Sequence, residues 1–302
     1  MRIAFAGTPE PAVVTLEALL GSQHDVAFVI TRPDAPTGRG KLLTPSAVAQ
    51  FAQQHGIECL KPTSLKDIED RLTDIDAVVV VAYGALVPAQ LLQVVKHGWI
   101  NVHYSLLPLL RGAAPVQWAI KNGDTTTGVS AFRIDQGLDT GPVFAQVHTD
   151  IGAQENSTQL LDRLTVMGSK LILQVLGDID TGKATPVAQD PTQVTLAPKI
   201  TSADARIDWT QSAQQVVNHV RAMAQKPGAW TMSGDERIKI PRAQVCPDSH
   251  DLSPGEVSVI SRIVCVGASD GCVELIDVQR PGGTSAHAYS WAKTLTGSVI
   301  LV

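Results

Sequence analysis

The sequence lacks the spacings that mark metal-binding and disulfide-rich proteins. None of its four cysteines forms a C-x-x-C pair, and its eight histidines show no compact ligand spacing. We therefore expect the cysteines to be reduced and structural, and we expect no metal site. The longest apolar run, from Ala77 to Ala82, is too short to cross a bilayer, and the first residues do not resemble a secretory signal. These absences indicate a cytoplasmic protein with no membrane partner.

Basic residues are not in excess either. The formal net charge is -5, and the segment from Ile207 onward holds eight basic and nine acidic residues. A nucleic acid would therefore have to be bound by a local basic surface, because a protein with a net negative charge does not attract a polyanion over long distances. A hydrophobic content of 44% with 18% charged residues is typical of a globular protein, and a length of 302 residues favours two domains.

The first half of the sequence alternates short apolar runs with segments of helical period. This alternation predicts a parallel sheet covered by helices, and the unbroken run at 77–81 fits a strand buried on both faces. We expect strands at 2–6, 26–30, 57–60, 77–81 and 99–102. We expect helices at 10–20, 45–54, 64–72 and 88–95, and an exposed, turn-rich loop at 31–41.

The pattern changes in the second half. A long helix at 157–176 is followed by a stretch at 181–202 that has no periodicity and contains three prolines, as connections between domains often do. Beyond it, one helix at 213–224 precedes closely spaced strand-like runs, which predict a small barrel. These runs lie at 237–240, 256–260, 263–266 and 272–278. We expect domains at 1–185 and 207–302, joined by a linker at 186–206.

Three familiar fingerprints are absent or fall in the wrong context. The turn at 7–10 lacks the glycine spacing of dinucleotide-binding proteins, which argues against a dehydrogenase. Gly38–Lys41 resembles part of a phosphate loop, but Leu42 stands where that pattern needs Ser or Thr. The string at 267–271 matches G-x-S-x-G, yet strand-like runs flank it on both sides, so we interpret it as a hairpin turn.

Asn101 and His103 stand two residues apart at the end of a predicted strand. Strand alternation places their side chains on one side, and ligands of open α/β sheets bind at the carboxyl ends of the strands. An amide and an imidazole at that position are able to donate hydrogen bonds to a developing oxyanion and to transfer protons near neutral pH.

Asp139 lies in a glycine-bounded loop at 135–141 with little apolar content. A carboxylate beside an imidazole raises the imidazole pKa and fixes the ring, so Asp139 is the natural partner for His103. The structural alternative is that Asn101 and His103 satisfy backbone groups at a strand end while Asp139 caps a turn. The residues alone leave both interpretations open, because such short patterns recur by chance.

Three longer motifs occur in order, Asn-Val-His-Tyr-Ser-Leu-Leu-Pro at 101–108, Arg-Gly-Ala-Ala-Pro at 111–115 and Gly-Leu-Asp-Thr-Gly at 137–141. Their order and spacing resemble the signature of the folate-dependent formyltransferases. The match continues in both halves of the chain, at 5–10, 38–41, 81–84, 197–200 and 205–209. Within this family, the sequence is most similar to members that formylate the methionine carried by initiator tRNA.

The resemblance implies a Rossmann-like α/β domain followed by an OB-like barrel that helps to hold tRNA, since small barrels of this kind commonly bind oligonucleotides. It also implies a monomer that takes 10-formyltetrahydrofolate as formyl donor and charged initiator tRNA as acceptor, without a metal. The implied catalytic residues are Asn101, His103 and Asp139.

Two further sets of residues receive roles from the same resemblance. It implies that the folate site is lined by Ser105, Leu106, Leu107 and Pro108. It implies that the acceptor end of the tRNA is contacted by Arg39 and Lys41, whose Gly-Arg-Gly setting permits backbone movement.

Two other functions remain as alternatives. A formyltransferase that acts on a small amine, such as an amino sugar nucleotide or a glycinamide ribotide, would use the same amide, imidazole and carboxylate. A non-catalytic RNA-binding module would bind charged tRNA without transferring a formyl group. The basic stretch at 32–41 and the Arg-Ile-Asp-Trp segment at 206–209 favour a tRNA substrate over a small amine, and only an assay of formyl transfer separates the enzyme from the RNA-binding module.

Overall fold

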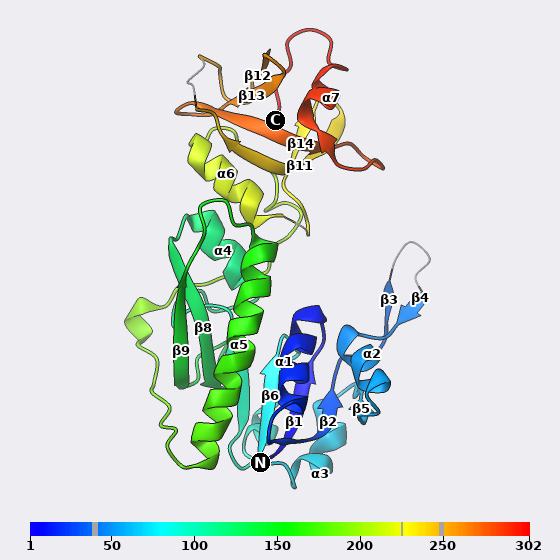
Figure 1. The fold of residues 1–302 in the computed structure, drawn as a ribbon, viewed down its shortest axis with the longest axis vertical. Helices are drawn as coiled ribbons and strands as arrows, with labels where there is room; N and C mark the ends of the chain where they lie inside the picture. The colour runs from blue at the N-terminus through cyan, green and yellow to red at the C-terminus, as the bar shows by residue number, and fades with distance from the viewer. Residues whose placement is uncertain (38–41, 225, 248–250) are drawn as a thin grey trace. The chain divides into compact units, whose positions relative to one another are not determined.

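The computed structural model describes residues 1–37, 42–224, 226–247 and 251–302 (Figure 1). The chain forms two compact units. The first comprises Met1–Gly112, Thr127–Thr149 and Leu161–Leu196, and the second comprises Ala113–Thr126, Asp150–Leu160 and Ala197–Val302. Within the described ranges, no helix has both the length and the apolar composition that spanning a bilayer requires.

A seven-stranded mixed sheet forms the centre of the first unit. In sheet order its strands are β5 (Cys59–Leu60), β2 (Asp25–Ile30), β1 (Arg2–Gly7), β6 (Ala77–Val81), β7 (Trp99–His103), β8 (Thr126–Arg133) and β9 (Val143–Asp150). The pairs from β5 to β7 are all parallel, as the sequence predicted, and β8 runs antiparallel to β7. The strands β8 and β9 were not predicted.

Several helices flank this sheet in the sequence order expected of an α/β domain. They are α1 (Glu10–Leu20), α2 (Ala47–Gln54), α3 (Glu69–Leu72) and α5 (Ser157–Asp180), with the 3-10 segments η1 (Leu65–Ile68), η2 (Ala89–Leu92) and η3 (Pro191–Gln193). The helix expected at 64–72 is divided between η1 and α3. Of the helix predicted at 88–95, only the short 3-10 segment η2 forms, so the prediction is wrong beyond Leu92. The carbonyl of Leu91 accepts the indole N–H of Trp99 at 3.0 Å instead of continuing a helical hydrogen-bond pattern.

The strand that carries the candidate catalytic residues is anchored on both sides. At its start, Trp99 is fully buried and its indole is held by the bond to Leu91. Near its end, Val102 packs against Gly168 of α5, where a Cβ atom would lie only 2.7 Å from the valine Cγ1. Any side chain at residue 168 would clash with Val102. Glycine at this position therefore allows α5 to pack closely against β7.

A short hairpin stands where an exposed loop was expected. β3 (Ala35–Thr37) pairs antiparallel with β4 (Leu42–Thr44), and β3 is exposed as predicted. Leu42 and Leu43 are 75% and 71% exposed, so this hairpin presents apolar side chains to solvent. Residues 38–41, which include Arg39 and Lys41, lie outside the described residues.

The second unit is built on an antiparallel sheet. Its strand order is β10 (Trp230–Ser233), β11 (Glu236–Val245), β14 (Cys272–Gln279), β13 (Ile263–Gly267) and β12 (Val257–Ile260), with β15 (Ala286–His287) paired to β14. Its helices are α4 (Pro115–Asn122), α6 (Ala213–Ala222) and α7 (Ala288–Ala292). The turn between β13 and β14 contains the G-x-S-x-G string, and Ala268 donates to Gly271 there at 2.8 Å, so the hairpin interpretation is confirmed.

The C-terminal residues close this sheet into a small barrel. Val302 exchanges two backbone hydrogen bonds with Met232 of β10, at 2.7 and 3.1 Å. On the other side, Leu301 donates to Gly255 and Val257 donates to Val299, at 2.8 and 2.9 Å. The last strand-like segment therefore bridges the two edges of the sheet, and the predicted barrel is confirmed.

Candidate active site

His103 lies at the carboxyl end of β7 and is only 6% exposed. Its Nε2 atom is 3.0 Å from the carbonyl oxygen of Leu110, and its Nδ1 atom is 3.8 Å from Oδ2 of Asp139. A carbonyl oxygen can only accept a hydrogen bond, so Nε2 carries a proton in this arrangement. In the neutral ring, Nδ1 is then unprotonated and faces the carboxylate.

Burial determines the resting charge of His103. It lowers the pKa of the imidazole below the ordinary value of 6.5, while the Asp139 carboxylate and the Leu110 carbonyl act in the opposite direction. The net direction is downward, so the ring is neutral near pH 7. A proton arriving at Nδ1 during a reaction would be stabilised by the neighbouring carboxylate.

Asp139 is held in place from several directions. Its Oδ2 atom accepts the backbone N–H of Gly112 at 2.8 Å, and its backbone adopts a left-handed φ of 55°. Two residues later, a Cβ atom on Gly141 would lie 1.8 Å from the carbonyl oxygen of Arg133. Only glycine permits this close approach, so the glycine-bounded loop has a geometric purpose.

A glutamine and an arginine that sequence reasoning missed secure the same loop. The Nε2 atom of Gln189 donates to the carbonyls of Asp139 and Gly141 at 2.8 and 2.7 Å. Arg111 in turn donates to Oε1 of Gln189 through Nε and a terminal nitrogen, at 3.0 and 2.7 Å. Gln189 comes from the stretch expected to be a linker, where the sequence Val-Ala-Gln-Asp between Pro186 and Pro191 gives no signal for this role.

Asn101 lies on the same strand as His103 and is half-buried. Its side chain makes no hydrogen bond with any residue in the described part of the chain. Because its amide is committed to no protein group there, both N–H donors are available to a ligand. The structure thus brings His103 and Asp139 into one cluster and leaves the Asn101 amide free beside it on β7.

The turn at 105–108 is held by hydrogen bonds to neighbouring residues of the protein. Ser105 is 1% exposed and donates to the carbonyl of Leu109 at 2.6 Å. Ser130 of β8 donates to the carbonyl of Ser105 at 2.7 Å and accepts the N–H of Leu107 at 3.0 Å. Of the four residues expected to line the folate site, Ser105 and Leu107 are buried, and only Leu106 and Pro108 are partly exposed.

A cavity of about 600 Å³ lies beside the loop that carries Asp139. Its walls are formed by residues from 89–98, which lead into β7, and from 133–137, which lead into that loop. A volume of this size accommodates a drug-sized heterocycle. From sequence we did not assign these wall residues to a site, because they form no compact motif.

Comparison with protein families identifies the class of this chain. Residues 1–176 match the formyl transferase family, and residues 199–296 match the formyl transferase C-terminal domain. The chain belongs to the formyl transferase family, as the motifs predicted.

Individual relatives resemble the chain over its whole length. It is 48% identical to the methionyl-tRNA formyltransferase of Corynebacterium diphtheriae, with 100% of this chain and 99% of that protein covered. It is 47% identical to the methionyl-tRNA formyltransferase of Streptomyces avermitilis, with 97% and 96% covered. Both matches cover the two domains together.

Solved structures share the fold at much lower identity. WlaRD, a sugar 3N-formyl transferase solved with dTDP and 5-N-formyl-THF, superposes with a TM-score of 0.71 at 17% identity, covering 94% of this chain and 99% of that one. The N-formyltransferase of Helicobacter canadensis, in complex with folinic acid and dTDP-3-aminofucose, gives the same TM-score and identity, with 92% and 98% covered. These likenesses show the α/β domain and the barrel as a shared architecture.

Proposed function

We infer that this protein transfers the formyl group of 10-formyltetrahydrofolate to the α-amino group of methionine carried by initiator tRNA, in translation initiation. The observation that carries this proposal is the agreement between near-half identity to methionyl-tRNA formyltransferases over the full chain and the His103–Asp139 cluster beside Asn101. Identity at this level over both domains favours the tRNA substrate over a small amine and over a non-catalytic role.

The reaction begins when the neutral methionyl amine attacks the formyl carbon. A tetrahedral oxyanion develops, and the free amide of Asn101 donates a hydrogen bond to it. Because Nε2 of His103 is bonded to Leu110, the position of this ring that exchanges protons is Nδ1. The attacking nitrogen loses its proton toward Nδ1, and Asp139 stabilises the imidazolium that results.

The second half of the reaction reverses the proton transfer. The bond between the formyl carbon and N10 of the folate breaks, and the proton held at Nδ1 passes to that departing nitrogen. The products are the formylated methionyl ester and tetrahydrofolate, so His103 and Asp139 return to their starting states. No proton is gained or lost in the complete cycle.

The donor is bound by two parts of the first unit in this proposal. The cavity of about 600 Å³ takes the pteridine, because its walls at 133–137 lead directly into the Asp139 loop. Leu106 and Pro108, the partly exposed members of the 105–108 turn, contact the part of the donor near the formyl group. Ser105 and Leu107 act by holding that turn.

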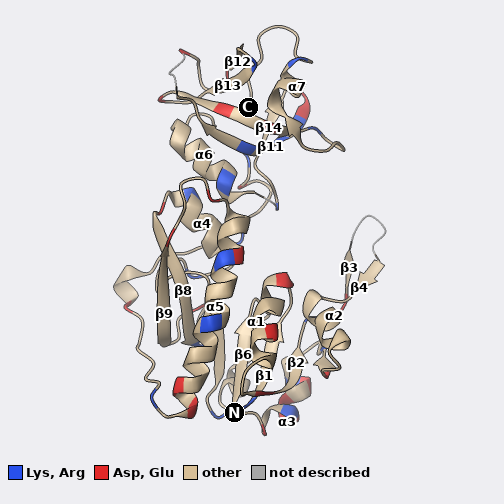
Figure 2. Ribbon diagram, in the orientation of Figure 1, with Lys and Arg blue, Asp and Glu red and all other residues tan. Residues whose placement is uncertain are grey.

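The acceptor is bound by Arg39, Lys41 and the barrel in this proposal. Figure 2 shows acidic and basic segments interspersed in the barrel, and Arg242 and Arg280 are paired with Asp277 and Glu236. A cationic site remains around Trp230, whose ring is flanked by Arg237 at 3.9 Å and Arg206 at 5.7 Å. Stacked arginine and tryptophan side chains suit the bases and phosphates of RNA.

We further propose that the protein works as a cytoplasmic monomer, with a catalytic domain at 1–185, a linker at 186–206 and a tRNA-binding domain at 207–302. All three catalytic groups come from one chain, so the reaction needs no second copy. The cytoplasm holds the charged tRNA that this reaction consumes.

The test uses the full chain with labelled 10-formyltetrahydrofolate and three acceptors, namely methionyl initiator tRNA, an amino sugar nucleotide and glycinamide ribotide. We expect label only on the charged tRNA, and none on uncharged tRNA, which lacks the amine. Label on a small amine would support the first alternative, and binding of charged tRNA without transfer would support the second.

A further inference from the structure

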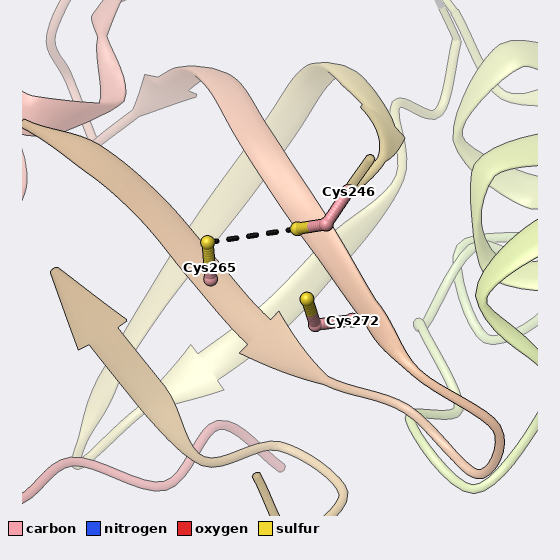
Figure 3. Close-up of side chains that lie close together, drawn as sticks. All are labelled: Cys246, Cys265 and Cys272. Carbon is pink, nitrogen blue, oxygen red and sulfur yellow. Dashed lines mark hydrogen bonds between the residues drawn. The ribbon is translucent and has the colours of Figure 1, made fainter. Parts of the chain in front are cut away.

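Three of the four cysteines meet in the barrel (Figure 3). Cys246 directly follows β11, Cys265 lies on β13 and Cys272 begins β14. Their sulfur atoms all lie within 4.8 Å of one another, and those of Cys246 and Cys265 are 3.5 Å apart. The fourth, Cys59, belongs to β5 in the first unit and takes no part.

The backbone of the barrel fixes this arrangement. Cys246 donates its N–H to the carbonyl of Cys272 at 2.9 Å, which ties the end of β11 to the start of β14. On the neighbouring pair of strands, Cys265 lies opposite Glu274, two residues from Cys272, so both thiols are on the same face of the sheet. The cluster is therefore determined by strand register and not by flexible loops.

The cluster is largely buried and has one carboxylate near it. Cys265 and Cys272 are each 2% exposed, and Cys246 is half-buried. The carboxylate of Glu274, which accepts from Gln244 at 2.7 Å, lies close enough to Cys265 to act on it electrostatically. Burial raises the pKa of the Cys265 thiol and Glu274 adds a smaller effect in the same direction, so this thiol stays protonated unless a cation displaces its proton.

The sulfur spacing fits one metal ion. Zinc binds thiolate sulfur at about 2.3 Å, which places the sulfurs of a tetrahedral site roughly 3.8 Å apart. The observed separations, one of 3.5 Å and none above 4.8 Å, differ from that value by no more than about 1 Å. Small side-chain rotations are enough to bring all three sulfurs to bonding distance.

We propose that Cys246, Cys265 and Cys272 form a three-thiolate zinc site that fastens β11, β13 and β14 together. The three thiols release their protons to solvent as zinc binds, and a water molecule supplies the fourth ligand from the open side of Cys246. Three thiolates leave a zinc complex with one net negative charge, whereas monovalent copper leaves two, which a buried site tolerates less well.

The site is independent of the catalytic cluster, which lies in the first unit. Its contribution is to the stability of the barrel, since a metal that binds only the folded state stabilises it by mass action. The alternative is that the three cysteines pack as small apolar side chains, as we expected from sequence. Zinc binding separates these two possibilities.

The test titrates the reduced, metal-free full chain with zinc against a chromophoric chelator. We expect one zinc per chain in the wild type, and the same in Cys59→Ala, which keeps the cluster intact. We expect Cys246→Ala to bind zinc at least about 100-fold more weakly. Removing a residue that binds the metal directly weakens binding more than removing a residue that only hydrogen-bonds to a ligand. Cys246 is less buried than Cys265 and Cys272, so its replacement should disturb folding least among the three cysteines of the cluster.

A second measurement keeps the test decisive if Cys246→Ala folds poorly. Cobalt added to the metal-free wild type should give the thiolate charge-transfer absorption, and zinc should abolish it and raise the Tm. Absence of that absorption in the wild type would overturn the proposal. So would equal zinc uptake in a folded Cys246→Ala, or failure of the isolated protein to bind zinc after any disulfide in it has been reduced.

Discussion

The Nδ1 atom of His103 lies 3.8 Å from Oδ2 of Asp139, with Nε2 of the same ring held by Leu110. The ring is therefore fixed by one bond and has its proton-accepting nitrogen directed toward a carboxylate. Burial lowers the pKa of His103, so the resting ring is neutral and ready to accept a proton.

Replacing Asp139 by Asn should lower the pKa of His103 further. The carboxylate stabilises the imidazolium, and its removal makes protonation less favourable, so the acid limb of the pH–rate profile moves to lower pH. The rate of formyl transfer should fall by about 100-fold or more, because the His103 imidazolium that forms when the amine loses its proton is no longer stabilised by a carboxylate. Both quantities are measured by single-turnover kinetics across pH 5 to about 8.

Glu17→Gln is the matched control for that charge change. Glu17 is exposed on α1 and takes no part in the site, so its profile should overlay that of the wild type. An acid limb that stays in place or moves upward in Asp139→Asn would contradict the assigned coupling.

Ser130→Ala should destabilise the protein by about 1 to 3 kcal/mol, because it leaves buried polar groups without partners. The Ser130 hydroxyl serves the carbonyl of Ser105, the N–H of Leu107 and the amide of Gln146. Urea unfolding measures this change. Thr181→Ala, which removes an exposed bond at the end of α5, should stay within about 0.5 kcal/mol, and similar losses in both variants would refute the account of the turn.

Alanine should impair catalysis at Gly141 and stabilise the protein at Gly177. Gly141→Ala places a Cβ atom 1.8 Å from the carbonyl of Arg133, so the loop must move and Asp139 with it. We expect at least a tenfold loss of kcat. At Gly177 in α5, no atom outside the local helix backbone lies within 4 Å of the new Cβ, so Gly177→Ala should stabilise the helix by up to about 1 kcal/mol with kcat unchanged. Normal kcat in Gly141→Ala would show that the loop geometry is not needed.

The parallel part of the sheet was predictable because β1, β2 and β6 each carry an apolar run of four or five residues. β6 is buried at every position, and β1 and β2 carry similar runs separated by the helical period of α1. The strand β8 was missed because Gly128 and Ser130 interrupt its apolar run, although both sites are buried for reasons of packing and hydrogen bonding. The local sequence pattern does not show which residues are buried through contacts with distant parts of the chain.

The catalytic group was predictable in part for the same physical reason. Asn101 and His103 share a strand, so their common direction follows from alternation. The support from Arg111 and Gln189 was not visible, because those residues meet only through the fold. The thiols of Cys246, Cys265 and Cys272 were likewise expected to be structural, since they come from three separate strands and lack a ligand spacing.

The rate of the chemical step in Asn101→Ala is the sharpest test of the proposed active site. With the enzyme in excess over methionyl initiator tRNA and saturating formyl-folate, the variant should transfer the formyl group about 100- to 1,000-fold more slowly than the wild type. Its Tm should be unchanged, because the amide has no hydrogen-bond partner in the described part of the protein. A single-turnover rate equal to that of the wild type would contradict the assignment of Asn101 as the oxyanion donor and the active site built around it.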